Sequence, residues 1–329
     1  MISRRHFVIA LGATAFAAPF ASPAQQPKRI PLVGFLLPGL PPPASAPPTI
    51  SALRLGLRDS GYVEGQTIAI EYRYASGKPE PLPGLALELV KLKVDVLVAN
   101  GPSPISAAKQ VTGAIPIVAI DLESDPVASG LVASLAKPGG NITGLFLDFP
   151  DMAGKWLELL TETVPGIRSA AVLWDTTTPQ FQLQALAAAA KARSIELEVV
   201  KFQQSAEIEA VLAAALKKRP QALIQLSSPI VRQASAGVAK FAQANRLPAI
   251  SMFSDFPDAG GLMSYGPILP VFFKRLASLV DKVLKGAKPG EIPLERPTVF
   301  EMVVNMKTAK ALGLKIPQSI RLRADRVIE

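Results

Sequence analysis

Short apolar runs alternate with amphipathic segments along the chain from residue 29 onward. In the first half, the apolar runs predict buried strands at residues 30–37, 66–73, 94–100, 115–121 and 141–148. The segments between them carry apolar side chains at helical spacing and predict helices at residues 49–60, 83–93, 106–112 and 126–136. Strands that alternate with helices of this length are typical of parallel sheets built from βαβ units.

The same alternation restarts in the second half of the chain. Strands are predicted at residues 169–175, 195–202, 221–227 and 247–253, and helices at residues 156–164, 181–194, 206–218 and 231–246. A chain of 329 residues exceeds the length at which one hydrophobic core usually divides. We therefore expect an α/β fold with two doubly wound lobes, each built on a parallel sheet.

The last part of the chain does not add a simple repeat. The Pro-rich stretch 288–297 follows a predicted helix at 269–286 and precedes a predicted strand at 300–305. A Pro-rich connector inside a compact chain indicates a crossing between lobes rather than a flexible linker. A second Pro-rich stretch, at 37–48, comes directly after the first strand and predicts a polyproline-like loop.

Residues 1–24 have the features of an export signal. A twin-arginine pattern at Ser3 to Val8 precedes an apolar run, and small residues stand at the exit around Ala24. The apolar run is shorter than the roughly 20 residues that a membrane-spanning helix needs, which disfavours a membrane anchor. We expect a signal peptide that is cleaved near Ala24 and a mature protein in the periplasm.

Cleavage after Ala24 would change the composition in a way that narrows the function. The formal charge would fall from +9 to +7, because the signal holds two arginines and no acidic residue. The single histidine, His6, would also be lost, and the chain has no cysteine. Without His and Cys, the usual zinc sites, Cys-His pairs and Ser-His-Asp triads are excluded, although a pair of carboxylates remains open. The charge is spread without basic blocks, so we expect no nucleic-acid partner, and we also expect no cofactor and no metal.

The candidate binding residues lie where the predicted strands end. Ligands of open parallel sheets bind beyond the carboxyl ends of the strands, where loops and helix N-termini converge. The polar residues in these loops are Gly101 and Ser103, Ser124 and Asp125, Asp175, and Ser227 and Ser228. The Ser and Asp residues of these loops are also typical N-cap residues, so capping of the following helix is their alternative role. If the loops of both lobes face one cleft, they form a polar clamp for a small organic anion, and Asp125 or Asp175 can meet an ammonium group.

Two aromatic residues stand at equivalent places. Trp174 and Tyr265 lie at the ends of the strands predicted at residues 169–175 and 262–266, where a ring can either join the core or stack on a ligand. Phe146 and Phe253 are weaker candidates of the same kind.

The segment AKPGGNITG at 136–144 combines closely spaced glycines with the sequon Asn141-Ile142-Thr143. A phosphate-binding loop runs from a strand through glycines to a helix, whereas this segment is predicted to run from a helix to a strand. We therefore interpret Pro138-Gly139-Gly140 as a helix stop near a hinge. We expect this segment not to bind a nucleotide, and we expect no routine glycosylation of Asn141.

Several segments together resemble one protein family. IPIVAIDLESDPVASGLVASLAKPGGNITG, GLRDSGYVEGQTIAIEYRYASG, GGLMSYGPILPVFFKR and FEMVVNMKTAKALGLKIPQSIRLRADRVIE resemble ABC-type substrate-binding proteins of the tryptophan/tyrosine-uptake-like family. These segments span nearly the whole mature chain. The loop at Gly101 to Ser103 and the loop at Ser124 to Pro126 correspond to family loops, whereas the loops at 38–48 and 175–179 depart from the family pattern.

The resemblance implies a type I periplasmic binding protein, in which two lobes joined by three crossings close on a ligand. The N-terminal lobe is expected at 25–146 and to be completed by about 267–296. The C-terminal lobe is expected at 147–266 and to be completed by about 297–329.

The leading hypothesis for the function is a monomeric solute receptor, not an enzyme. It would deliver an amino acid, an aromatic acid or a similar small carboxylate to ABC permease and ATPase subunits. A ligand-sensing module for a membrane receptor is the alternative, and a hydrolase that uses two carboxylates is the third hypothesis.

Overall fold

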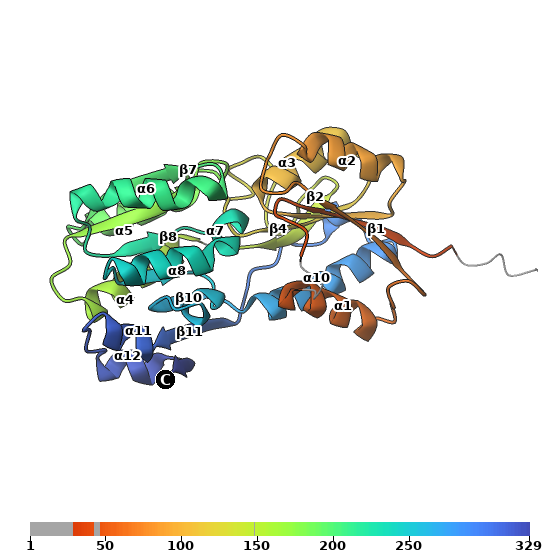
Figure 1. The fold of residues 1–329 in the computed structure, drawn as a ribbon. Helices are drawn as coiled ribbons and strands as arrows, with labels where there is room; N and C mark the ends of the chain where they lie inside the picture. Colours follow the sequence, from red (N-terminus) through yellow and green to blue (C-terminus); the bar gives the residue numbers. More distant parts are fainter. Residues whose placement is uncertain (1–28, 43–46, 148) are drawn as a thin grey trace, which may run out of the picture.

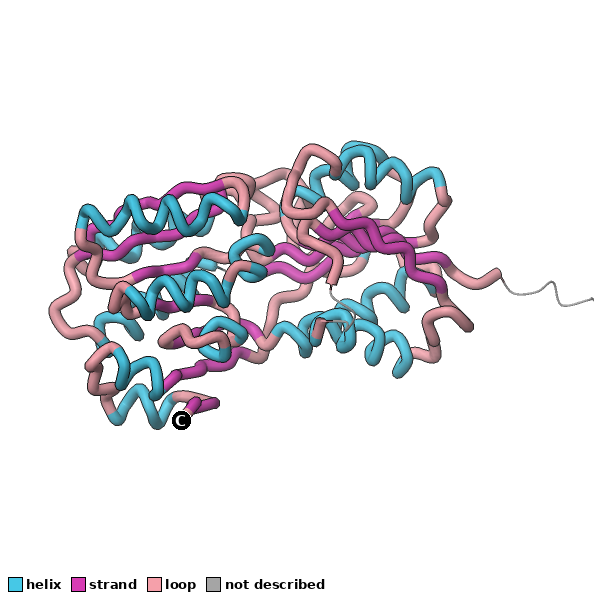
Figure 2. The backbone as a smooth tube through the Cα atoms, in the orientation of Figure 1, coloured by secondary structure: helices cyan, strands magenta, loops and turns pink. Residues whose placement is uncertain are grey.

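The chain forms two α/β lobes that lie side by side (Figure 1). The computed structural model describes residues 29–42, 47–147 and 149–329, so the predicted signal peptide lies outside the described residues. Figure 2 shows the strands of each lobe gathered in one sheet with helices packed around them. The predicted fold class is therefore confirmed. Within the described residues, no helix combines the length and the apolar character that a bilayer crossing needs.

The first lobe is built on a parallel five-stranded sheet in the order β2-β1-β3-β4-β5. Its elements are β1 (Leu32–Leu37), α1 (Pro48–Asp59), β2 (Ala69–Tyr74), α2 (Leu82–Lys91), β3 (Val96–Asn100), α3 (Pro102–Val111), β4 (Ile117–Asp121) and β5 (Ile142–Phe146). Every residue of β4 and β5 is buried, as continuous apolar runs predict for strands that are covered on both faces.

The second lobe is built on a seven-stranded sheet in the order β12-β11-β10-β9-β8-β6-β7, in which only the β10–β11 pair is antiparallel among the described strands. Its first elements are α4 (Phe149–Thr163), β6 (Ser169–Asp175), α5 (Phe181–Lys191), β7 (Glu196–Phe202), α6 (Ile208–Ala215), β8 (Leu223–Gln225), α7 (Pro229–Gln233), α8 (Ser235–Ala244), β9 (Ala249–Ser251), α9 (Asp255–Asp258) and β10 (Met263–Pro267). After a return to the first lobe, the chain adds β11 (Phe300–Asn305), α11 (Met306–Ala311), α12 (Gln318–Arg323) and β12 (Arg326–Ile328).

One long helix joins the first lobe although it follows the second lobe in sequence. This helix, α10 (Leu269–Leu284), lies along α1 (Figure 1). Gly56 permits the close approach, because a Cβ at this position would lie 2.7 Å from the carbonyl oxygen of Lys274. The apolar faces of the two helices pack on each other and on the sheet, with Leu53, Leu57 and Leu276 among the buried side chains.

The chain passes between the lobes three times. The first crossing connects β5 to α4, and the second connects β10 to α10. After α10, Glu295 remains with the first lobe, because its N–H donates to Gly144 at 3.0 Å and its carbonyl accepts from Phe146 at 2.9 Å. The third crossing then leads from this residue to β11, so the Pro-rich stretch 288–297 ends in a crossing.

One predicted helix is wrong. Residues 126–136 form turns instead of a helix. The carboxylate of Asp125 accepts the N–H groups of Val127 and Ala128 at 2.8 and 3.0 Å, and Gly130 adopts a left-handed conformation with φ +68°. The Asp125 carboxylate therefore caps a single turn, and the left-handed Gly130 ends that turn before a helix can extend.

The segment 136–144 has a structural role at the return from α10. The N–H of Gly139 donates to the carbonyl of Gly290 at 3.1 Å, which brings the glycines beside the segment that leads to the third crossing. The side chain of Asn141 donates to the carbonyls of Thr112 and Ile115. Thr143 is fully buried and donates to Ile292. Both polar side chains of the sequon are therefore used inside the fold, and there is no helix here for the glycines to stop.

A second helix differs from its prediction. The single helix predicted at 231–246 is two helices, α7 and α8, which meet at Ala234. The hydroxyl of Ser228 accepts the N–H groups of Ile230 and Val231 at 3.0 and 3.3 Å, so α7 begins earlier than predicted, directly after β8. This early start places the side chains of α7 at the interface between the lobes.

Candidate functional site

A cavity of about 400 Å³ lies between the lobes, beyond the carboxyl ends of the parallel strands. Both lobes and α10 contribute to its wall, which is mainly apolar and includes Leu37, Ile50, Leu122, Leu269 and Phe273. The cavity has the size and the apolar character of a site for a small organic molecule. Among the described residues, no group of three or more His, Cys, Asp or Glu side chains could hold a metal ion.

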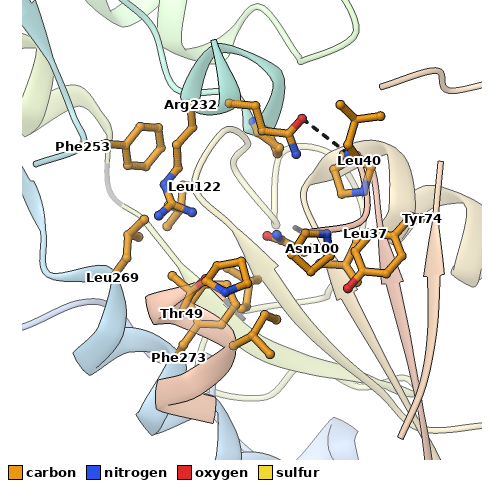
Figure 3. A pocket seen from close by; sticks show the side chains of 18 of the residues that line it. Leu37, Leu40, Thr49, Tyr74, Asn100, Leu122, Arg232, Phe253, Leu269 and Phe273 are labelled. Carbon is orange, nitrogen blue, oxygen red and sulfur yellow. Dashed lines mark hydrogen bonds between the residues drawn. The ribbon is translucent and has the colours of Figure 1, made fainter. Parts of the chain in front are cut away.

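Arg232 of α7 supplies the positive charge of the cavity. Its guanidinium group reaches into the cavity from the second lobe (Figure 3). The Nε atom donates to Asp255 at 3.0 Å, and the guanidinium carbon lies 5.6 Å from the centre of the Phe253 ring. The two terminal nitrogens make no hydrogen bond to the described residues. A planar group held in this way offers two parallel donors to a carboxylate.

Asp255, the first residue of α9, fixes the direction of Arg232. Burial raises the pKa of Asp255, and the Arg232 guanidinium offsets part of that rise. One carboxylate oxygen pairs with Arg232, while the other, Oδ1, is buried and has no hydrogen-bond partner among the described residues. The second lobe therefore presents a cation that is oriented by a neighbouring carboxylate.

The first lobe places uncharged polar groups on the other side of the cavity. Asn100 ends β3, Tyr74 ends β2, and Thr49 lies in the first turn of α1 (Figure 3). Burial raises the pKa of Tyr74, so its hydroxyl keeps its proton at neutral pH. The cavity thus has a charged end in the second lobe and a hydrogen-bonding end in the first lobe, with apolar walls between them.

The Pro-rich loop after β1 forms part of the wall. Pro38, Gly39, Leu40, Pro41 and Pro42 line the cavity. The loop is tied to the segment that follows β2, because the carbonyl of Gly39 accepts the N–H of Ser76 at 2.9 Å. It also approaches the second lobe, where the N–H of Leu40 donates to Gln233 at 3.4 Å (Figure 3).

Glu123 lies at the point where the loops of the two lobes meet. It follows β4, lines the cavity and is only 3% exposed. Its carboxylate accepts the Ser227 hydroxyl at 2.6 Å and the Leu122 N–H at 3.2 Å. Burial raises the pKa of Glu123 to about 8, and the negative charge of the neighbouring Asp121 contributes to this rise.

The structure places the predicted loop residues of the first lobe close to the cavity but not in its wall. Gly101 is the residue before α3 and has φ +93°, and Ser103 donates to the Thr177 carbonyl at 3.3 Å across the lobes. Ser124 is buried, and its N–H and hydroxyl both donate to Asp121. Asp125 holds the turn described above. Ser103 instead lines a shallower groove with Thr177, Thr178 and Pro179.

The predicted loop residues of the second lobe are joined in a buried network. Asp175 is 2% exposed, and its carboxylate accepts the Ser228 hydroxyl at 2.5 Å and the Thr177 N–H at 2.9 Å. Ser227 is held by Gln182, as its N–H and carbonyl both bond to that side chain at 2.8 Å. Ser228 caps α7. Most polar groups of these residues therefore bond within the second lobe, whereas the Ser227 hydroxyl donates to Glu123 of the first lobe.

The two predicted aromatic residues lie outside the cavity wall. Trp174 is 5% exposed in the core, and its Nε1 has no hydrogen-bond partner among the described residues. Tyr265 stacks on Phe300 with ring centres 6.0 Å apart. Of the two weaker candidates, Phe146 is buried in the core of the first lobe, whereas Phe253 lines the cavity under Arg232.

The predicted loops border the cavity, but the residues that line the cavity are neighbours of the predicted ones. Asn100, Glu123 and Pro229 line the cavity, whereas Gly101, Ser124 and Ser228 beside them in sequence are not among its lining residues in the described part of the chain. Arg232 and Asp255 were missed. The signal for Arg232 was a single charge within an otherwise apolar helix start after Ser228-Pro229, and the signal for Asp255 was an acidic residue directly after a predicted strand.

The two lobes, the three crossings and the cavity between them define the class of type I periplasmic binding proteins. Within that class, the sequence model of the ABC transporter substrate binding protein family matches residues 45–328. The chain therefore belongs to this family of solute-binding proteins, which bind small ligands that are delivered to an ABC importer. Proteins of this kind typically act outside the cytoplasm.

The chain is also similar to individual proteins of known name or structure. A tyrosine-binding protein of Clostridioides difficile strain R20291 is 28% identical over 273 residues, which cover 82% of this chain and 76% of the relative. A Streptococcus pneumonia ABC domain in complex with L-Trp has a TM-score of 0.81 at 22% identity and covers 91% of this chain and 99% of its own. The ligand-free, open structure of a Clostridium difficile substrate-binding protein with adhesive properties has a TM-score of 0.62 at 24% identity, with coverages of 91% and 99%.

Hydrogen bonds join the loops of the two lobes directly. The Ser103 hydroxyl donates to the Thr177 carbonyl at 3.3 Å, and the Ser227 hydroxyl donates to the Glu123 carboxylate at 2.6 Å. We call this arrangement, in which the loops of the two lobes are in contact, closed.

Proposed function

We propose that the chain captures a small organic carboxylate in the cavity between its lobes, with Arg232 as the group that binds the carboxylate. The observation that carries this proposal is the orientation of Arg232, whose Nε is bound by Asp255 while its terminal nitrogens face the cavity. A guanidinium fixed in this way loses little conformational entropy when a carboxylate binds.

The rest of the cavity narrows the class of ligand. Apolar walls favour a hydrophobic or aromatic body, and Asn100 and Tyr74 can bond a polar group at its far end. Tyrosine and tryptophan, which the relatives bind according to their names, combine these features. Amino acids, aromatic acids and similar small carboxylates are therefore the first candidates.

The site holds its ligand without catalysis in this proposal. The two oxygens of Glu123 and those of Asp175 accept hydrogen bonds from the protein, and the carboxylate of Asp255 pairs with Arg232. These contacts support a positioning role for the acids. We therefore expect that the intact protein does not turn over a bound ligand.

We also propose the setting in which the chain works. The export signal predicted at 1–24 would carry it to the periplasm, where it would act as a monomer and deliver its ligand to a permease and an ATPase. The lobe boundaries predicted at residues 146 and 266 also belong to this proposal. Direct contacts of Ser103, Ser124, Asp125 and Asp175 with a ligand stay a prediction, because these side chains lie beside the cavity and not in its described wall. Size-exclusion chromatography of the exported protein would test the expected monomer.

A ligand screen followed by one substitution tests the role of Arg232. Amino acids, aromatic acids and small carboxylates are first screened for a rise in melting temperature, because a ligand well above its dissociation constant stabilises a protein by a few kcal/mol. For each hit, calorimetry then compares the wild type with Arg232→Gln. Loss of a charged hydrogen bond of about 1.5–3 kcal/mol predicts a dissociation constant about 10 to 100 times higher.

Arg321→Gln is the matched control, because Arg321 is exposed on α12 in the second lobe, away from the cavity. This variant is expected to bind as the wild type does. Equal affinities of Arg232→Gln and the wild type for every carboxylate hit would refute the proposed role of Arg232.

A further inference from the structure

Glu123 is the one carboxylate of the described cavity wall that bonds across the two lobes. The acceptor belongs to the loop after β4 of the first lobe, and the Ser227 hydroxyl that donates to it belongs to the loop after β8 of the second lobe. Separation of the lobes would break this 2.6 Å bond and expose the carboxylate to water. The surroundings of Glu123 therefore depend on whether the protein is open or closed.

Both partners of this bond are held in place. Gln182, itself fully buried, binds the backbone of Ser227 through two hydrogen bonds. On the other side, the N–H of Glu123 donates to Asp121 at 2.9 Å. The two loops are thus rigid, and the side chain of Glu123 has no free route to solvent while the lobes are closed, since it is 3% exposed.

The charges that face Glu123 are mostly of its own sign. Asp121 ends β4, directly before this loop, and is fully buried, and Asp175 approaches from the second lobe. Across the cavity, Arg232 is paired with Asp255. Among the described residues, Glu123 makes no ion pair. Closing the lobes on an ionised carboxylate in this position would bury an uncompensated charge beside a like charge.

We propose that Glu123 takes up one proton from water when the lobes close, so that ligand capture by this protein is coupled to proton uptake. The carboxylate of Glu123 becomes a carboxylic acid. Burial raises the pKa of the neighbouring Asp121 as well, but Asp121 accepts the N–H groups of Glu123 and Ser124 and the Ser124 hydroxyl, which favour its ionised form, so we assign the proton to Glu123. The bond to Ser227 survives this change, because a serine hydroxyl can donate to the carboxylate or accept from the acid. The inference rests on the proposed use of the interlobe cavity, and Glu123 acts as a positioning residue that sets the closing equilibrium.

The direction of the pH dependence follows from the two states. In the closed protein the pKa of Glu123 is raised to about 8, whereas an open, solvated glutamate has an ordinary pKa of about 4.3. The closed state binds the proton more tightly, so it is favoured at low pH and loses this advantage as the pH rises through the closed-state pKa. The ratio of closed to open protein is expected to fall by up to about tenfold per pH unit between pH 6 and 8, and to change little above that range.

The chain has no cysteine, so two introduced cysteines can report the lobe distance alone. Gln110 of α3 and Gln180, the residue before α5, are exposed near the two sides of the groove between the lobes. Spin labels at Gln110→Cys and Gln180→Cys, measured in the intact protein between pH 6 and 9, give the closed and open populations. The measurement needs no ligand, so it remains decisive even if the screen for a carboxylate fails.

Three variants complete the test. Glu123→Gln mimics the neutral acid and is expected to keep the closed population high and independent of pH. Ser227→Ala is expected to reduce the closed population while the fall with pH remains. Glu209→Gln, an exposed acid of α6, should behave as the wild type does. A wild-type distance distribution that does not change between pH 6 and 9, or the same pH dependence in Glu123→Gln, would overturn the proposal.

Discussion

Gly144→Ala is expected to destabilise the first lobe, because β5 passes β4 at a distance that leaves no room for a side chain. A Cβ at this position would collide with the carbonyl oxygen of Ala119 and lie 2.7 Å from its nitrogen. These are backbone atoms of the neighbouring strand, paired in register with Gly144. They can move away only if the hydrogen bonds between the two strands lengthen.

The expected loss combines two costs. Forcing an extra methyl group into a packed interior usually costs about 1–3 kcal/mol. The backbone of Gly144 has φ +154°, and holding a side chain in a sparsely populated region costs about 1–3 kcal/mol more. We therefore expect the free energy of unfolding to fall by about 2–5 kcal/mol, because one shift of the backbone can relieve part of the clash and part of the strain together. The displacement would also reach Asp121, which ends β4, and Glu123, which follows it.

The assay must report on the first lobe. Both tryptophans, Trp156 and Trp174, lie in the second lobe, so their fluorescence follows the wrong half of the molecule. Urea unfolding is therefore followed by circular dichroism, and hydrogen exchange is measured on peptides that contain β4. Gly84→Ala in α2 is the control: its Cβ would meet no atom within 4 Å, and we expect a gain of up to about 1 kcal/mol. A Gly144→Ala protein within about 0.5 kcal/mol of the wild type would refute the steric argument.

Two further substitutions test polar contacts that support the loops. Gln182→Leu should lower the free energy of unfolding by about 2–4 kcal/mol, because the buried N–H and carbonyl of Ser227 both lose their partner. Thermal unfolding measures this loss, and a loss below about 1 kcal/mol would contradict the prediction. Asn141→Ala should cost about 1–2 kcal/mol through the loss of its bonds to the carbonyls of Thr112 and Ile115; an unchanged urea midpoint would show that water replaces the amide.

The sequence predicts the sheets well because a strand that is buried on both faces appears in the sequence as a continuous apolar run. The strands Ser169–Asp175 and Phe300–Asn305 coincide with their predictions, since each is bounded by polar or turn residues. The segment 126–136 carries Val and Leu at helical spacing, yet it forms turns. Hydrophobic spacing alone does not reveal that Gly130 adopts a left-handed conformation and ends the turn that Asp125 caps.

The site is predictable at the level of loops but not of side chains. Topology places the loops after β3, β4 and β8 at one cleft, whichever residues they contain. Which residue of each loop faces the cavity depends on turns such as the one that directs Ser124 to Asp121 and leaves Glu123 in the wall. Arg232 depends in addition on where α7 begins, which the Ser228 cap decides.

The place of α10 has a consequence for the order in which the protein can fold. The side of α1 that carries Leu53 and Leu57 is covered by a helix that begins only at Leu269. During synthesis, this apolar surface of the first lobe therefore stays uncovered until the chain has been made through β10 of the second lobe and α10 has followed. The second lobe in turn lacks β11 and β12 until the chain has visited the first lobe again. Neither lobe can be completed alone, and a chain that ends near residue 266 would hold two unfinished cores.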